Sequence, residues 1–179
     1  MTIDRYQEIC AAFRWRVPEK FNIGRDCCGR WAGDRYRFAL YYEDDSSATS
    51  AWTYWDLQQQ ANRLSNALAA MGVRRGDRVA IILPQRPETA IAHIACYQMG
   101  AVAMPLSVLF GPEALQYRID NSESAVAIVD DASLANLLPV RNELHLAAGR
   151  LATGDERPSA LPCPALLKDS SCAQHSHSH

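Results

Sequence analysis

Lysine is scarce in this chain of 179 residues, since Lys20 and Lys168 are the two lysines among 18 basic residues. The net charge is −2 at pH 7, which leaves no basic footprint. Nucleic acids and anionic membranes are therefore not expected partners, because both are recognised through concentrated positive charge. The shortage of lysine also restricts phosphate chemistry, which commonly needs a lysine placed beside the phosphates.

Long hydrophobic runs are absent as well. No stretch reaches the roughly 18 apolar residues of a membrane-spanning helix, because His93 and Gln98 interrupt the best candidate. The first ten residues, MTIDRYQEIC, have neither the basic nor the apolar region of a secretory signal peptide. We therefore expect a cytoplasmic protein without a membrane span.

Signatures of metal and dinucleotide sites are missing. The six cysteines are scattered and form no C-x-x-C pair, so we expect reduced thiols rather than disulfides or zinc ligands. No G-x-G-x-x-G follows an expected strand, which disfavours a dinucleotide-binding domain. Gly24 and Gly29 have the spacing of a phosphate-binding loop, but Arg30 and Trp31 replace the lysine and the hydroxyl residue that the loop needs. We interpret this segment as part of a packed helix.

Two histidine features are also interpreted as non-catalytic. His93 lies in an expected helix with no marked carboxylate or nucleophile beside it, so packing is favoured over a general-base role. His175, His177 and His179 could bind a metal weakly, but such a short tract without further ligands favours a solvated tail.

What the sequence does contain is a complete strand, helix and strand unit over residues 75–111. Residues 78–83 are apolar and partly β-branched, as in a buried strand. Pro87 suits a first helical turn, apolar residues recur at three- and four-residue spacing up to Met99, and Gly100 can close the helix. Residues 101–104 form a second apolar strand, which implies parallel pairing through a right-handed crossover.

Further elements extend this unit into a larger fold. Residues 37–43 and 50–52 flank a polar turn and predict a hairpin, and Thr53 with Asp56 forms the capping pattern of a helix that ends near Gly72. We also expect helices at residues 3–13, 22–31, 112–119 and 131–138, and a third apolar strand at residues 125–129. The fold class is therefore α/β, with a mostly parallel sheet, flanking helices and a hairpin. Periodicity fades beyond Arg141, so we expect one domain over residues 1–140 and a disordered tail over residues 141–179.

A family resemblance rests on the segments FNIGRDCCGRWA (residues 21–32), TYWDLQQQANRLSNAL (53–68), RGDRVAIILPQRPE (75–88) and YQMGAVAMPLSVLFGPEALQYRI (97–119). Their order and spacing resemble the N-terminal region of the AMP-forming acyl-CoA synthetases, members of the adenylate-forming superfamily. The resemblance covers about residues 21–138 and implies a partial N-terminal subdomain of that fold. Residues 105–115, PLSVLFGPEAL, are most similar to synthetases that act on acetate-like, medium-chain or other fatty acids.

The resemblance implies a two-step ligase reaction that uses a carboxylic acid, ATP, Mg²⁺ and coenzyme A. The carboxylate attacks the α-phosphate of ATP and releases pyrophosphate, and the thiol of coenzyme A then displaces AMP from the acyl-adenylate. The phosphate loop, the adenine segment, the ribose-binding aspartate and the catalytic lysine of the family do not occur in these 179 residues. Lys168 lacks the glycine-rich context of that lysine. We therefore expect no cofactor in this chain and no activity of this chain alone.

The same resemblance supplies the candidate site. The family's loop corresponding to residues 107–111 lies toward the coenzyme A and acyl channel, so Leu109, Phe110 and Gly111 are candidate channel residues. Packing of the turn is the competing interpretation, because a Leu-Phe pair is more often core than ligand surface. A non-catalytic α/β binding or interaction module is the alternative function. A change of reading frame near Arg141 is our hypothesis for the loss of resemblance beyond that residue.

Overall fold

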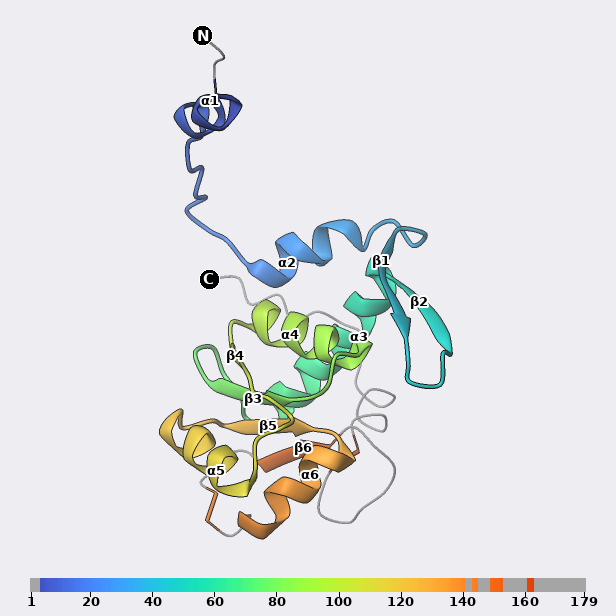
Figure 1. The fold of residues 1–179 in the computed structure, drawn as a ribbon, viewed down its shortest axis with the longest axis vertical. Coiled ribbons are helices and arrows are strands. Elements are labelled where there is room, and N and C mark those ends of the chain that lie inside the picture. The colour runs from blue at the N-terminus through green and yellow to red at the C-terminus, as the bar shows by residue number, and fades with distance from the viewer. Residues whose placement is uncertain (1–3, 141–142, 145–148, 153–160, 163–179) are drawn as a thin grey trace.

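A computed structural model describes residues 4–140, 143–144, 149–152 and 161–162. Figure 1 shows a sheet with helices on both sides, a separate hairpin and a helix that stands away from the rest. In chain order the elements are α1 (Arg5–Ala12), α2 (Ile23–Cys27), the 3-10 helix η1 (Gly29–Trp31), β1 (Phe38–Glu43), β2 (Thr49–Thr53), α3 (Tyr54–Ala70), β3 (Arg78–Ile82), α4 (Pro87–Met99), β4 (Val102–Pro105), α5 (Pro112–Asn121), β5 (Val126–Val129), α6 (Asp131–Leu137), the 3-10 helix η2 (Leu138–Val140), β6 (Gly149–Ala152) and β7 (Leu161–Pro162).

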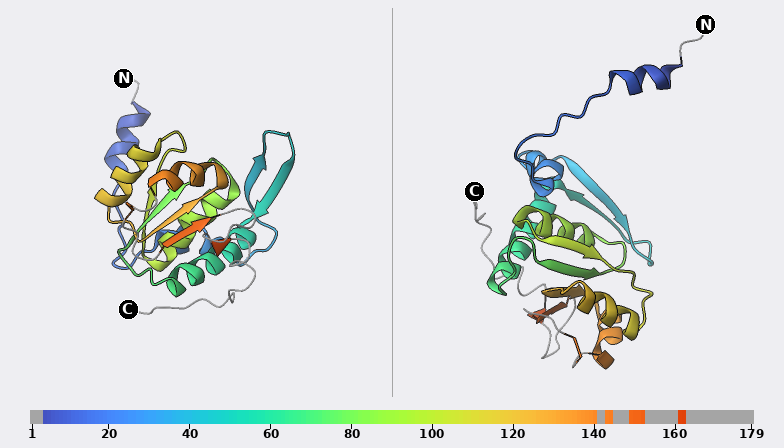
Figure 2. Two further views of the ribbon diagram at one scale, coloured as in Figure 1. Left: turned by 90° about the horizontal axis from the view of Figure 1, so that it is seen from below. Right: turned by 90° about the vertical axis from the view of Figure 1, so that its left-hand side faces the viewer.

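The central sheet has the order β4-β3-β5-β6-β7, and every neighbouring pair is parallel. Helices α3 and α4 cover one face, and α5 and α6 cover the other, as the two views of Figure 2 show. The predicted α/β class with a parallel sheet, flanking helices and a hairpin is therefore confirmed. The chain steps from β3 to β4 on one side and then returns to β5 on the other side of β3.

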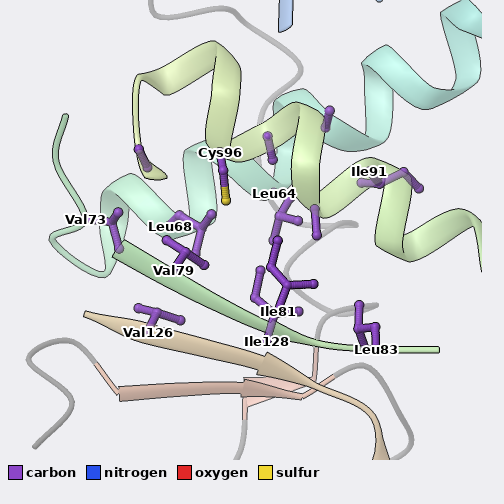
Figure 3. Packing of buried hydrophobic residues seen from close by; sticks show 14 of the residues in the cluster. Leu64, Leu68, Val73, Val79, Ile81, Leu83, Ile91, Cys96, Val126 and Ile128 are labelled. Atoms are coloured by element: carbon purple, nitrogen blue, oxygen red, sulfur yellow. The ribbon is translucent and has the colours of Figure 1, made fainter. Parts of the chain in front are cut away.

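Strands β3 and β5 are buried on both faces, because alternate side chains enter two different cores. Val79 and Ile81 of β3 lie in the core beneath α3 and α4, together with the β5 residue that pairs with each. Figure 3 shows these side chains meeting Leu64 and Leu68 of α3 between the helices and the sheet. Ala80 enters the opposite core beneath α5 and α6. This double burial explains why both strands read as continuous apolar runs.

Buried thiols belong to the first of these cores. Cys28 and Cys96 are both almost fully buried, and burial raises the pKa of Cys28 to about 11 and the pKa of Cys96 to about 12. Both side chains therefore stay protonated near neutral pH and pack as small apolar groups. Within the described ranges, Cys10 and Cys27 are also free thiols, and both are exposed.

Local signals place the ends of the two longest helices as predicted. At the start of α3, the Thr53 hydroxyl accepts a hydrogen bond from the Asp56 backbone N–H at 3.1 Å. The Asp56 carboxylate in turn accepts from the Thr53 backbone N–H at 3.0 Å, which completes a capping box. At the end of α4, Gly100 has φ of 77°, a left-handed conformation that glycine adopts without a steric penalty.

The predicted hairpin is present, with β1 and β2 paired antiparallel from Phe38 opposite Thr53 to Glu43 opposite Thr49. Its turn is organised by Asp44, whose Oδ1 accepts hydrogen bonds from the Ser46 and Ala48 backbone N–H groups at 2.8 and 3.0 Å. A hydrogen bond from the Ser46 hydroxyl, together with these backbone bonds, lowers the pKa of Asp44. The carboxylate is thus held in the charged form that the turn requires.

The expected helix over residues 22–31 is two helices rather than one. Asn22 caps α2 as predicted, with its Oδ1 accepting from the Arg25 backbone N–H at 3.1 Å. The chain then breaks at Cys28, which has φ of −123° and ψ of −59°, and continues as η1. The break turns the Cys28 thiol into the core, where it donates to the Tyr54 carbonyl at 3.5 Å. Burial of this side chain therefore overrides the continuous helix that the sequence suggested.

Gly24 allows α2 to lie directly on α4. A Cβ atom built on Gly24 would lie 2.8 Å from the Gln98 backbone nitrogen and 2.9 Å from the Gln98 Cβ. Replacing glycine by alanine in a helix normally gains about 1 kcal/mol, but forcing an extra carbon into a packed contact costs about 1–3 kcal/mol. We expect Gly24→Ala to destabilise the protein by about 1–2 kcal/mol, because the contact is with backbone and cannot give way.

Urea unfolding followed by circular dichroism measures this change in the free energy of unfolding. Gly33→Ala is the matched control, because a Cβ there meets no atom within 4 Å. A Gly24→Ala variant as stable as the parent would show that α2 does not rest on α4.

Two expectations concern the ends of the chain, namely the helix over residues 3–13 and the tail over residues 141–179. Helix α1 forms within residues 3–13 as predicted, yet its apolar residues are exposed and no residue of α1 is buried. In the expected tail, β6 and β7 continue the parallel sheet. The remaining residues of 141–179, apart from Glu143 and Leu144, lie outside the described ranges, and the domain boundary at residue 140 stays a prediction.

Candidate functional site

A groove among the described residues has a volume of about 700 Å³ and lies beyond the carboxyl ends of β3 and β4. One wall is the start of α4, another is the loop after β4, and Leu40, Tyr41 and Tyr42 of the hairpin contribute a third. The loop after β3 leads to α4 on one face of the sheet, whereas the loop after β4 leads to α5 on the other face. Open parallel sheets bind ligands in the crevice that such diverging loops create. This groove is therefore the candidate functional site.

The loop between β3 and α4 is held by short-range contacts on the rim of the groove. The Thr89 hydroxyl donates to the Pro84 carbonyl at 2.5 Å, which ties the first turn of α4 back to the end of β3. Arg86 forms an ion pair with Glu88 at 3.0 Å, and about a third of each side chain is exposed. A partly exposed pair of this kind adds little stability, but it fixes where the guanidinium lies. Arg86 thus supplies a positioned cation at the groove.

His93 lines the same groove from α4, and its Nδ1 lies 3.2 Å from the Tyr97 hydroxyl. The donor in this contact depends on the histidine tautomer. Partial burial lowers the pKa of His93, so the ring is neutral at pH 7. In the described part of the chain His93 forms no ion pair with a carboxylate. The interpretation of His93 as a packing residue rather than a general base stays a prediction.

The lowered pKa of His93 predicts a pH-dependent stability. The unfolded state takes up a proton on His93 as the pH falls below about 6.5, whereas the folded state resists that proton because the ring is partly buried. The contribution of His93 to stability is therefore complete at higher pH and is lost as the pH falls through its folded-state pKa. We expect urea midpoints to fall less for His93→Gln than for the parent between about pH 7.5 and about pH 5.5. Equal falls would contradict this role.

The structure places the predicted channel residues next to the groove but not in its lining. Ser107 and Val108 line it, whereas Leu109 is 90% exposed on the outside of the turn. Phe110 packs against the core beneath α5 and α6, with the Arg118 guanidinium 4.0 Å from its ring. Gly111 caps the start of α5. The assignment of residues 109–111 to a channel stays a prediction.

The other walls of the groove were not predicted from the sequence. Residues 84–86 follow one expected parallel strand and residues 105–108 follow the next, so their proximity could have been predicted from the topology. The position of the hairpin wall could not be predicted in this way, because nothing in residues 40–42 indicates where the hairpin packs. No group of three His, Cys, Asp or Glu side chains in the described ranges could hold a metal ion.

Comparison with known protein families matches residues 30–171 to the family described as AMP-binding enzyme. The chain belongs to this family. The matched segment includes all the elements that form the groove, from the hairpin to α4 and the loop after β4. It also extends past Arg141, and the changed reading frame near that residue stays a hypothesis. The family is one of enzymes, which favours the ligase interpretation over a stand-alone binding module.

Individual relatives agree with the family. The chain is 37% identical over 120 residues to an acetyl-coenzyme A synthetase of Streptomyces coelicolor, with 66% of this chain and 18% of that protein covered. It is 36% identical over 141 residues to an acetyl-coenzyme A synthetase of Syntrophus aciditrophicus, with 76% and 22% covered. The chain thus spans about a fifth of the length of these curated relatives.

A solved structure shares the fold. The acyl-CoA synthetase of Brucella canis superimposes with a TM-score of 0.84 at 25% sequence identity, and the match covers 96% of this chain and 33% of that chain. The resemblance to AMP-forming acyl-CoA synthetases is thereby confirmed. Among the helices described, none is long and apolar enough to cross a membrane.

Proposed function

We propose that this chain supplies part of the substrate channel of an AMP-forming acyl-CoA synthetase. The observation that carries the proposal is the family match over residues 30–171, which contains every wall of the groove. In the proposed reaction, a carboxylate oxygen attacks the α-phosphate of ATP, the bond to pyrophosphate breaks, and an acyl-adenylate forms. The thiol of coenzyme A then attacks the acyl carbon and AMP leaves. The names of the relatives favour acetate or a similar small acid as the substrate.

The residues of the groove support a role in enclosing substrate rather than in phosphate chemistry. Ile81 and Leu83 are buried at its base, and Leu106 and Val108 form a half-buried apolar rim. Such walls exclude water from a reactive mixed anhydride, which would otherwise hydrolyse. We extend the proposal to Leu109, Phe110 and Gly111 as the outer edge of the channel.

Charge handling is proposed to come from sequence other than these 179 residues. The sequence contains no loop rich in serine, threonine and glycine that ends in lysine, and Arg86 is the cation of the described groove. Adenylation needs the developing phosphate charge to be neutralised, which a single arginine paired with Glu88 does not achieve. The 179-residue polypeptide is therefore proposed to be inactive alone, and its site of action is proposed to be the cytoplasm.

Turnover and binding are tested separately. Purified chain incubated with ATP, Mg²⁺, acetate and coenzyme A is expected to release no AMP above background, measured by chromatography.

Ligand-observed NMR with coenzyme A is expected to show contact that Ala90→Phe abolishes, because Ala90 lines the groove at the start of α4. Ala135→Phe is the control, since Ala135 is exposed on α6 beneath the other face of the sheet. AMP release by the chain, or binding unaffected by Ala90→Phe, would refute the corresponding half of the proposal.

A further inference from the structure

The groove beyond β3 and β4 has one formally charged side chain in its lining, that of Arg86, among the residues that the structure describes. Within the described ranges the lining contains no carboxylate, and His93 is neutral at pH 7 because burial lowers its pKa. The other lining side chains are apolar or carry uncharged polar groups. An anion that enters the groove therefore meets one attractive charge and no repelling charge in the lining.

The guanidinium of Arg86 keeps most of its hydrogen-bonding capacity. Its Nε donates to Glu88 Oε2 at 3.0 Å, and the hydrogen bonds of the described residues leave its two terminal nitrogens without a partner. A guanidinium has five N–H donors, and four of them belong to the terminal nitrogens. These donors form a planar fork that matches the oxygens of a phosphate or a carboxylate. Glu88 thus orients the side chain through one bond and leaves the fork available to a ligand.

Arg86 lies on the exposed rim of the groove, whereas the base of the groove is apolar and buried. The Arg86 side chain is 35% exposed, while Ile81 and Leu83 are 1% and 6% exposed. Figure 3 shows Leu83 beyond Ile81 along the chain that leaves β3. A ligand that occupies both regions needs an uncharged part that lies on the base and an anionic part that reaches the rim.

Among the substrates of the proposed reaction, coenzyme A has this division. Its pantetheine arm is uncharged and flexible, and its nucleotide end carries a diphosphate and a further phosphate. The charged end favours the exposed rim, because burying an unpaired charge is costly. Acetate is far smaller than a groove of about 700 Å³, and the triphosphate of ATP needs more than one cation. The chemistry of the groove therefore fits coenzyme A best.

We propose that Arg86 binds a phosphate of coenzyme A at the rim of the groove, with the pantetheine arm lying along the apolar base. This inference rests on the proposed function, because it takes the groove to be part of the substrate channel. Glu88 partly neutralises the guanidinium and so weakens its attraction for the phosphate. Arg86 is then a residue that determines specificity, because it favours coenzyme A over an uncharged thiol of the same shape.

Affinities of the 179-residue chain for coenzyme A and for pantetheine, measured by ligand-observed NMR titration, test this role. We expect Arg86→Gln to weaken the binding of coenzyme A about tenfold, because a charge-assisted contact is lost, and to leave the binding of pantetheine within about twofold. Equal weakening of both ligands, or no weakening of coenzyme A binding, would overturn the proposal.

Arg25→Gln is the matched control for the loss of charge. Arg25 is exposed on α2, which packs beside Gln98 at the other end of α4. Its replacement removes the same positive charge without touching the lining of the groove. We expect its affinities for coenzyme A and pantetheine to match those of the parent. A tenfold loss of coenzyme A binding in this variant would show that net charge, rather than the position of Arg86, governs binding.

Glu88→Gln tests the same contact with the opposite sign. Partly exposed ion pairs are worth up to about a fivefold change in affinity, so release of the guanidinium is expected to tighten coenzyme A binding about two- to fivefold. In the Arg86→Gln background the same substitution is expected to have no effect, because Glu88 acts through the guanidinium. Coenzyme A binding that Glu88→Gln leaves unchanged or weakens, or an equal gain in both backgrounds, would contradict the proposed contact.

Failure of the proposed function gives a different result. If neither ligand bound, or if Ala90→Phe left the binding of both unaffected, the groove would not be the substrate channel, and the inference would fall with the proposed function. Binding of both ligands that Ala90→Phe abolishes, with the same ratio of affinities in the parent and in Arg86→Gln, would refute the role of Arg86 alone.

Discussion

Replacing Ile81 by alanine is expected to lower the free energy of unfolding by about 3 kcal/mol. Ile81 is 1% exposed and lies at the centre of the core beneath α3 and α4, opposite Ile128 of β5. Because Ile81 packs between the sheet and the two helices, the cavity left by the lost carbons cannot collapse fully. A domain of this size is stable by about 5–15 kcal/mol, so the loss is a large share of the total.

Chemical unfolding in urea, monitored by far-ultraviolet circular dichroism, measures this loss. Ile9→Ala is the matched control, because it removes the same carbons from a side chain that is 61% exposed on α1. Its expected effect on the free energy of unfolding of the isolated chain is within about 0.5 kcal/mol. Similar losses for both variants would mean that the core beneath α3 and α4 is loosely packed.

The second large effect is expected for Gln98→Ala, at about 2–3 kcal/mol, because three buried polar groups each lose one hydrogen bond together. The Gln98 Oε1 accepts a hydrogen bond from Gln58 Nε2 at 2.7 Å, and its Nε2 donates to Ser65 Oγ at 2.5 Å and to Asn62 Oδ1 at 3.2 Å. These three partners lie on α3 and are each less than a tenth exposed. Gln98 on α4 thus joins the two helices through a polar network inside their interface.

Gln59→Ala is the control for this network, because Gln59 lies next to Gln58 but on the half-exposed side of α3. We expect its unfolding free energy to stay within about 0.5 kcal/mol of the parent. Thermal and urea unfolding of both variants should rank them in the same order. If Gln98→Ala were as stable as Gln59→Ala, the hydrogen bonds that remain among the groups on α3 would suffice, and the network would not hold α4 to α3.

The elements that the sequence predicts well are those with local determinants. Thr53 and Asp56 satisfy each other within one turn, Gly100 supplies a left-handed residue, and Pro87 sits where its missing N–H costs nothing. These signals place the start of α3 and both ends of α4 without knowledge of the rest of the fold. The alternation of β3 and β5 between two cores similarly depends on strand geometry alone.

The features that the sequence does not predict are those whose conformation depends on contacts between residues far apart in the chain. The break at Cys28 follows from burial of its thiol against α3, and the tolerance of Gly24 in α2 follows from its approach to Gln98. For the site, the resemblance points to Leu109, Phe110 and Gly111, which stays a prediction, and the groove beside them is lined by three segments far apart in the chain. The wall formed by the hairpin depends on where β1 packs against the rest of the fold, and no residue of β1 indicates that position in the sequence.

The order of strands in the sheet has a consequence for synthesis of the protein on the ribosome. Strand β3 finds both of its neighbours, β4 and β5, within the next two crossovers, so the pairings close short loops. Chains emerge with the N-terminal end first, and units with local connectivity can form before the following sequence is translated. The walls of the groove can therefore be assembled while any polypeptide that follows residue 140 is still being made.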